Sequence, residues 1–141
     1  MYTMNTLSDT TGRVAARLVI VLAIALAAAP MEALAHARMI RSSPTAGGVT
    51  QPPAQVELWF NELLDGGFNS IIVYPATEAS AKTHTSLTQG EAKVDPKDKT
   101  HLTVTVKPLP PGQYMVEWRV LSLDGHSAPG RFKFRVIAAK Q

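Results

Sequence analysis

The chain after residue 36 is a series of short segments in which apolar and polar side chains alternate. In residues 101–106, Leu102, Val104 and Val106 alternate with polar neighbours. Similar alternation, or a short β-branched run, occurs at residues 55–60, 70–74, 113–121 and 131–137. A period of two with one polar face is typical of half-buried antiparallel strands.

Proline and glycine separate these segments. They cluster at residues 43–48, 51–53 and 108–112, where they favour turns. Residues 76–100 are polar, and we expect loops there with one weak edge strand at 91–94. No stretch after residue 36 has a helical period of 3.6. The sequence therefore predicts an all-β, immunoglobulin-like Greek-key β-sandwich of about seven short antiparallel strands.

Large aromatic side chains are expected to supply most of the core, since burying one contributes about 1.5–3 kcal/mol. Trp59 lies in the opposite phase to Leu58 and Phe60, so a partly exposed position is expected for it. The expected core aromatics are Trp59, Phe60, Tyr114, Trp118, Phe132 and Phe134.

The first 35 residues have a different pattern. Arg13 and Arg17 precede an apolar run at 18–29, and the small-residue triplet 33–35 follows it. This order predicts a secretory signal peptide at 1–35, a mature domain at 36–141 and a periplasmic location. The run is shorter than the roughly 20 apolar residues of a membrane span, and no later segment is as apolar, so no membrane insertion of the mature chain is expected. An uncleaved N-terminal anchor is the alternative.

Composition narrows the function classes. The absence of cysteine excludes disulfides, thiolate metal sites and cysteine nucleophiles. The net charge is +3, but basic residues are interspersed with acidic ones, as in residues 93–99. Without a dense basic stripe, nucleic acid is a poor candidate partner.

Asp124 and His126 are the first candidates for chemistry. They are two residues apart, so in an extended chain they point the same way, and Gly125 between them permits a bend. A carboxylate and an imidazole can then converge on one point. The alternative is a hairpin turn with a solvated histidine.

His36 strengthens the metal hypothesis because cleavage after Ala35 would make it the first residue. A free α-amine with a pKa of ~7.7–8.0 and the ring Nδ1 then form one chelate. Together with Asp124 and His126 they give three nitrogens and one oxygen, a set that suits Cu(II). Zn(II) and Ni(II) are weaker alternatives, and coincidence is the alternative for His36 itself.

The remaining histidines and methionines are weaker candidates. His84 and His101 are expected to be surface residues and not ligands. After residue 36 only Met39 and Met115 remain, and they are too far apart in the sequence to indicate a thioether site for Cu(I).

Several ordered motifs together resemble the CopC-type periplasmic copper-binding proteins. The match runs through nearly all of residues 36–137, although each motif alone is weak. The matching segments are His36-Ala37, the Ser43-Pro44-x-x-Gly47 turn, the alternating 56–62 segment ending in Glu62, residues 109–120 from Leu-Pro-Pro-Gly to Trp-Arg-Val, and Ser122-x-Asp124-Gly125-His126 with the strand after it.

The resemblance implies a Cu(II) site formed by the His36 amine and ring with Asp124 and His126. It places Glu62 in a supporting role, orienting the amine or a ligand, with a plain surface carboxylate as the alternative. One branch of the family has a methionine-rich loop, which this chain lacks, so a Cu(II)-only member is expected. Some relatives are fused to a membrane domain; here such a partner would be a separate copper transporter.

Three functions remain open. The first is a monomeric, non-catalytic periplasmic protein that sequesters or carries Cu(II) in copper homeostasis and resistance. The second is an N-terminal-histidine copper oxidase or monooxygenase acting on polysaccharides. The third is a metal-free immunoglobulin-like adhesion or chaperone module.

Overall fold

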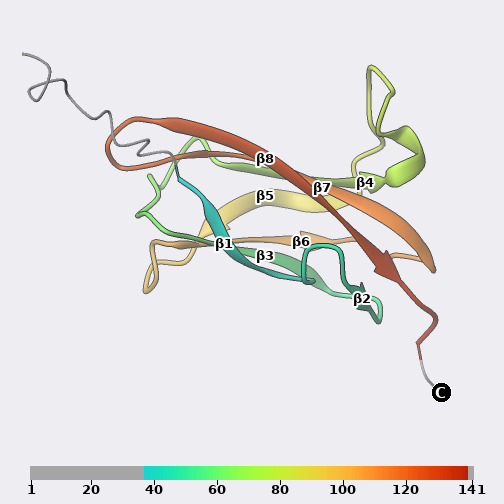
Figure 1. Cartoon of the computed structure of the whole chain (residues 1–141). Coiled ribbons are helices and arrows are strands. Elements are labelled where there is room, and N and C mark those ends of the chain that lie inside the picture. Colours follow the sequence, from blue (N-terminus) through green and yellow to red (C-terminus); the bar gives the residue numbers. More distant parts are fainter. Residues whose placement is uncertain (1–36, 140–141) are drawn as a thin grey trace, which may run out of the picture. The chain divides into compact units, whose positions relative to one another are not determined.

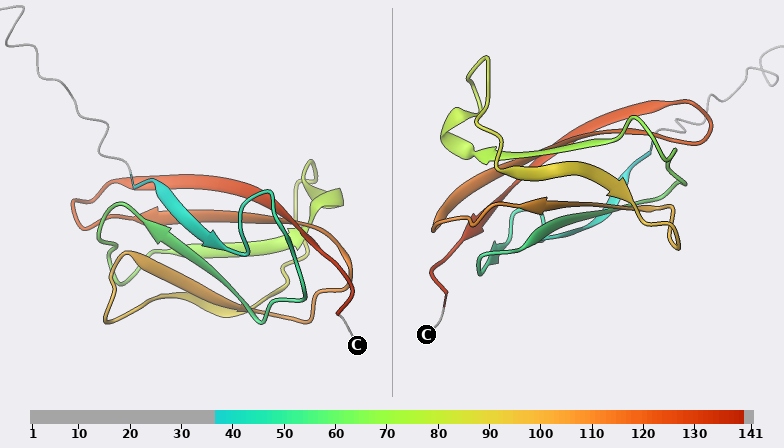
Figure 2. Two further views of the ribbon diagram at one scale, coloured as in Figure 1. Left: turned by 60° about the horizontal axis from the view of Figure 1, so that its bottom comes forward. Right: turned by 180° about the vertical axis from the view of Figure 1, so that it is seen from behind.

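The computed structural model describes residues 37–139, and Figure 1 shows their arrangement. Two four-stranded sheets face each other, as the two views in Figure 2 show. The first has the strand order β1-β3-β6-β5, and the second has the order β2-β8-β7-β4. The strands are β1 Met39–Ser43, β2 Val49–Thr50, β3 Gln55–Phe60, β4 Ser70–Pro75, β5 Thr88–Val94, β6 His101–Val106, β7 Gly112–Leu121 and β8 Ser127–Val136.

The predicted Greek-key β-sandwich is confirmed, with corrections to its strands. Eight strands are present in the described part, where about seven were expected. The added strands β1 and β2 carry little of the alternating pattern that revealed the others. β5 begins at Thr88, three residues before its expected start at 91. β8 begins at Ser127, four residues before its expected start at 131. The short β2 pairs with β8 in parallel, whereas only antiparallel pairs were expected.

The core lies between the two sheets and follows the predicted phases. Leu58, Val104 and Val116 are almost completely buried, as are Phe60, Tyr114, Trp118, Phe132 and Phe134 among the expected aromatics. Trp59 lies outside this cluster on the outer face of its sheet, which confirms its expected partial exposure and corrects its place in the core.

Three features gather at one end of the sandwich. The start of β1, the loop between β3 and β4, and the turn between β7 and β8 lie there in both figures. The short strand β2 lies at the opposite end. The candidate metal residues therefore belong to one end of the fold.

Candidate metal centre

Asp124 and His126 lie in the tight turn that joins β7 to β8. The Ser122 N–H donates to the His126 carbonyl at 3.0 Å, and the Gly125 N–H donates to the Ser122 carbonyl at 2.9 Å. Gly125 has a φ of +88°, a conformation that a residue with a side chain rarely adopts. The segment therefore forms the hairpin turn that was the alternative expectation. The backbone hydrogen bonds of this turn also bring the two side chains together.

The structure places the Asp124 carboxylate against the His126 ring. The ring Nδ1 lies 3.0 Å from Oδ2, and the His126 backbone N–H donates to Oδ1 at 3.1 Å. Both side chains are about half exposed. A carboxylate and an imidazole nitrogen are therefore fixed at an accessible point, as the spacing of two residues predicts.

Ser122 holds the other side of the Asp124 carboxylate. Its hydroxyl donates a short hydrogen bond to Oδ1, and its side chain is buried, with 2% of the residue exposed. This bond, followed by those from His126, lowers the pKa of Asp124 to about 2. Asp124 is therefore a carboxylate over the whole physiological pH range.

The sequence reasoning gave Ser122 no role, although the residue stands in the matched motif. The available signal was a serine two residues before an aspartate at the end of a strand. A serine there can bond the backbone of the turn or the side chain of the aspartate.

Glu62 reaches the same place from the loop after β3. The Asn61 N–H donates to the Arg38 carbonyl at 3.0 Å. Because β1 and β3 run antiparallel, the next pair of facing residues is Ala37 and Glu62. On the other side the Leu123 N–H donates to the Leu63 carbonyl at 3.0 Å. A hollow of about 260 Å³ is lined by Glu62, Leu63, Ser122, Leu123 and Asp124. Glu62 and Asp124 therefore share one hollow.

The described chain begins beside this turn. Ala37 is buried in the core cluster and lines a hollow of about 390 Å³ together with Trp118, Ser127 and Ala128. The residue that follows His36 in the sequence thus lies near the residues that follow His126. His36 itself and the predicted signal peptide at 1–35 lie outside the described residues.

The donor set fits copper chemically. Two ligands that are each about 2.0–2.1 Å from one ion, at right angles, lie about 2.8–3.0 Å apart. The observed separation of Nδ1 and Oδ2, 3.0 Å, lies in this range, which is also the range of a hydrogen bond. Between residues 37 and 139, no group of three or more histidine, cysteine, aspartate or glutamate side chains has the arrangement of a metal site. Asp124 and His126 would supply two donors to an ion at this point.

His84 and His101 each pack on an aromatic ring outside this turn. The His101 ring stacks on Trp59 with centroids 4.3 Å apart, and its side chain is only 14% exposed. The His84 ring stacks on Tyr74 with centroids 3.9 Å apart. The expectation that both are surface histidines is corrected, because each packs flat against an aromatic ring.

Of the two methionines of the mature chain, Met39 lines the hollow that Ala37 and Ser127 share. Met115 is buried in β7, and Met39 is partly buried against the core. Among residues 37–139, no helix has the length and apolar character of a membrane span.

Comparisons with known proteins identify the family that the sequence motifs resemble. The CopC domain family matches residues 39–137. Copper resistance protein C of Pseudomonas syringae pv. tomato is 32% identical over 108 residues, which cover 74% of this chain and 82% of that protein. The crystal structure of CopC from Methylosinus trichosporium OB3b has a TM-score of 0.65 at 27% identity and covers 75% of this chain and 98% of that one.

A longer relative is similar over only part of its length. Copper transport protein CutJ of Bacillus subtilis is 34% identical over 121 residues. The alignment covers 83% of this chain but 21% of CutJ, so this chain spans about a fifth of that protein.

Proposed function

Because the chain belongs to the CopC domain family, we propose that it binds copper and acts in copper resistance without catalysing a reaction. The mature protein sequesters or carries Cu(II) in the periplasm. A single ion is held by the amine and ring of His36, by Asp124 and by His126.

The observation that carries this proposal is the 3.0 Å approach of the His126 Nδ1 to the Asp124 Oδ2. Without an ion, this distance suits a shared proton. A divalent ion replaces that proton, because metal binding requires a deprotonated ring nitrogen and a carboxylate. The Asp124 carboxylate is ionised at neutral pH and is therefore available as an oxygen ligand.

The placement of Ala37 supports His36 as the remaining ligand. Ala37 is buried and lines one hollow with Ser127 and Ala128, so the residue to which His36 is bonded lies near the turn. Cleavage of the predicted signal peptide after Ala35 would supply the free amine. Glu62 would orient this amine from the shared hollow, in a supporting role.

Nitrogen and oxygen donors favour Cu(II) over Cu(I). Cu(I) prefers thioether and thiolate sulfur, and the described chain has no cysteine and only two separated methionines. We therefore propose a Cu(II)-only member of the family.

Trp59 does not supply the open aromatic surface that a polysaccharide oxidase would need. Such an oxidase needs a flat, open aromatic surface for its substrate. The Trp59 ring is covered by His101 from β6, and the Arg41 guanidinium from β1 lies 3.7 Å from its centre. Since β1 and β6 flank β3, the two side chains cover opposite faces of the indole.

Calorimetric titration of the mature protein with Cu(II) tests this function. One ion per chain should bind with submicromolar affinity, and His126→Ala should weaken binding by orders of magnitude, since a strong nitrogen ligand is lost. Lys133→Ala, an exposed change on β8, is the matched control and should bind as the wild type does. Absence of binding by the wild-type protein would favour the metal-free module.

A further inference from the structure

The two sheets of the sandwich differ in charge. The strands of the first sheet contain two basic and two acidic residues. The strands of the second sheet contain one acidic residue, Glu117, and four basic residues: Arg119, Arg131, Lys133 and Arg135. All four basic residues are exposed, and in the part of the chain that the structure describes none of them forms a salt bridge. The positive charge of the second sheet is therefore available to a partner.

Strand alternation gathers these charges on one face. Arg131, Lys133 and Arg135 alternate with two buried phenylalanines, so they point outward from β8 at intervals of about 7 Å. On β7, the neighbour of β8, Glu117 and Arg119 are exposed in the same phase. Basic side chains thus run along β8 and continue onto β7.

Exposed apolar side chains lie among these charges. Val49 in β2 pairs with Arg135, and Ile72 in β4 pairs with Glu117, so each points to the same side as the residue that it faces. Ile137 is two residues beyond Arg135 and is also exposed. The outer surface of the second sheet therefore combines basic with apolar side chains.

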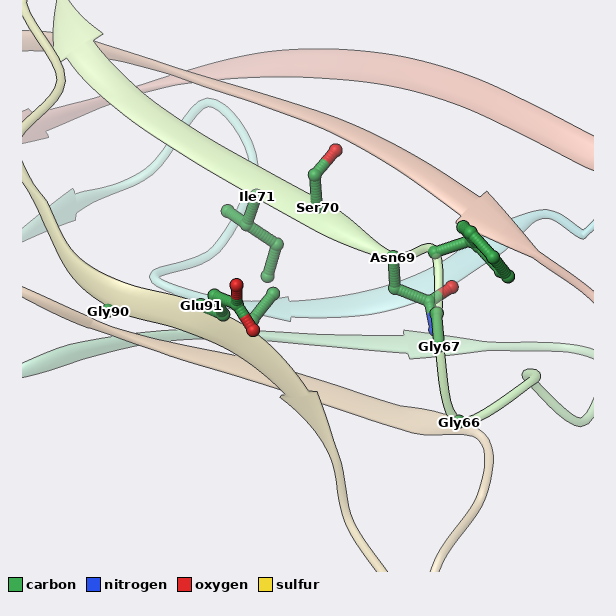
Figure 3. Close-up of a pocket in the computed structure, with 9 residues that line it drawn as sticks. Gly66, Gly67, Asn69, Ser70, Ile71, Gly90 and Glu91 are labelled. Carbon is green, nitrogen blue, oxygen red and sulfur yellow. The ribbon is translucent and has the colours of Figure 1, made fainter.

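This surface ends at the edge strand β4. Figure 3 shows Ser70 and Ile71 on opposite sides of the strand, with Ile71 directed into a hollow of about 420 Å³ between β4 and β5. Ser70 pairs with Arg119 and so belongs to the outer surface. Farther along β4, the histidine of the loop 76–87 covers Tyr74, and this loop contains one acidic and one basic residue. The border of the surface therefore does not cancel its positive charge.

We propose that this basic face, which consists of the outward side chains of β7 and β8 with Val49, Ile72 and Ile137, adsorbs the protein to an anionic phospholipid surface. Lysine and arginine attract the headgroup phosphates, while the exposed apolar side chains enter the boundary between headgroups and acyl chains. The protein lies on the surface without inserting a span. This inference goes beyond the copper function and does not depend on it.

A lipid surface fits the basic face better than other occupants do. A nucleic acid offers phosphates but no apolar surface for Val49 and Ile137, and the aromatic side chains of the second sheet are all buried and cannot stack on bases. A second copy docked through the same face would bring like charges together, which costs free energy. An acidic protein must match the shape of the face, whereas a fluid lipid surface accommodates charges that are spread over two strands.

Co-sedimentation of the mature protein with vesicles of equimolar phosphatidylglycerol and phosphatidylcholine tests the proposal. We expect binding at an ionic strength of about 0.1 M, where the Debye length is about 10 Å, and no binding to phosphatidylcholine alone. Lys133→Glu should lower the partition coefficient by about 25-fold, because each charge near the surface contributes about fivefold and the substitution changes the charge by two. Lys93→Glu, at an exposed position of the first sheet, changes the net charge equally and should stay within about twofold of wild type.

Single-cysteine labels report the orientation, because the chain has no cysteine of its own. An environment-sensitive fluorophore on Ile72→Cys should shift its emission to the blue when vesicles are added. The same label on Thr105→Cys, an exposed position of β6 in the first sheet, should not shift.

Three results would each overturn the proposal: no binding of the wild type to the anionic vesicles, equal losses with Lys133→Glu and Lys93→Glu, or equal shifts of the two labels. Binding to polyglutamate without binding to the vesicles would assign the basic face to an acidic protein and would also overturn it.

Discussion

Trp118 and Gly130 face each other directly across β7 and β8, and the indole fills the space that a side chain at position 130 would need. A Cβ at Gly130 would lie 2.2 Å from Cζ2 of Trp118, far inside contact distance. Trp118 also lines the hollow beneath Ala37. The glycine therefore allows the indole to lie flat at the end of the sandwich that carries the metal residues.

Gly130→Ala should destabilise the apo protein. The methyl group forces Trp118 or β8 to move, and overpacking of this kind costs about 1–3 kcal/mol. Gly66→Ala is the matched control, because nothing lies within 4 Å of a Cβ at that position. Urea unfolding measures both. Equal stabilities of the two variants would show that the close approach of Trp118 is not required.

Ser122→Ala should raise the pKa of Asp124 from about 2 toward its ordinary value, because the largest cause of the depression is removed. Loss of a partner that orients a ligand should also weaken Cu(II) binding by about 10–100-fold. NMR titration of the carboxyl carbon gives the pKa, and calorimetry gives the affinity. Ser122→Thr keeps the hydroxyl and should restore much of both properties; no change in either property with alanine would contradict the assigned role of Ser122.

Acid should destabilise the apo protein, because the pKa values of several of its carboxyl groups are depressed in the folded state. Hydrogen bonds from the Lys97 N–H and from the Thr100 hydroxyl lower the pKa values of Asp95 and Asp98, respectively. Each group stabilises the fold fully above its unfolded pKa of about 3.9. This contribution disappears as the pH falls through the lower folded value, which for Asp124 is about 2.

Thermal unfolding between neutral pH and pH 2 measures this effect. The melting temperature should decrease as the pH is lowered below 4. Asp98→Asn should make this decrease with pH less steep, because one titrating group is absent. A melting temperature that stays constant down to pH 2 would show that these hydrogen bonds do not stabilise the fold.

His101→Gln should separate structural from metal-binding histidines. The variant loses the stack on Trp59, worth about 0.5–1.5 kcal/mol, and the approaches to Asp95 and Glu57. Its stability should fall, while its Cu(II) affinity should stay within about twofold of wild type. A large loss of affinity would instead assign His101 to the metal site.

The sequence predicted the fold where alternation was strong and missed strands where it was weak. Residues 101–106 alternate throughout and form β6 as expected. The first half of β8, Ser127-Ala128-Pro129-Gly130, lacks β-branched residues and contains a proline that normally argues against a central strand. Proline is tolerated because β2 pairs only with Arg135 and Val136, so this half of β8 has an open edge.

The site was predictable where the spacing dictated geometry. Two residues around Gly125 were expected to converge, and Asp124 and His126 do so. Their partner Ser122 was missed because a buried serine at the end of a strand has no distinctive pattern. The flat packing of His84 and His101 on aromatic rings depends on which strands are neighbours, and a single sequence does not give that pairing.

The central claim is that the amine of His36 binds copper together with Asp124 and His126. Its most direct test compares Cu(II) affinity of the mature protein beginning at His36 with that of a variant carrying one additional residue before it. The account predicts that the added residue weakens binding by orders of magnitude while the melting temperature of the apo protein is unchanged. Equal affinities of the two proteins would contradict it.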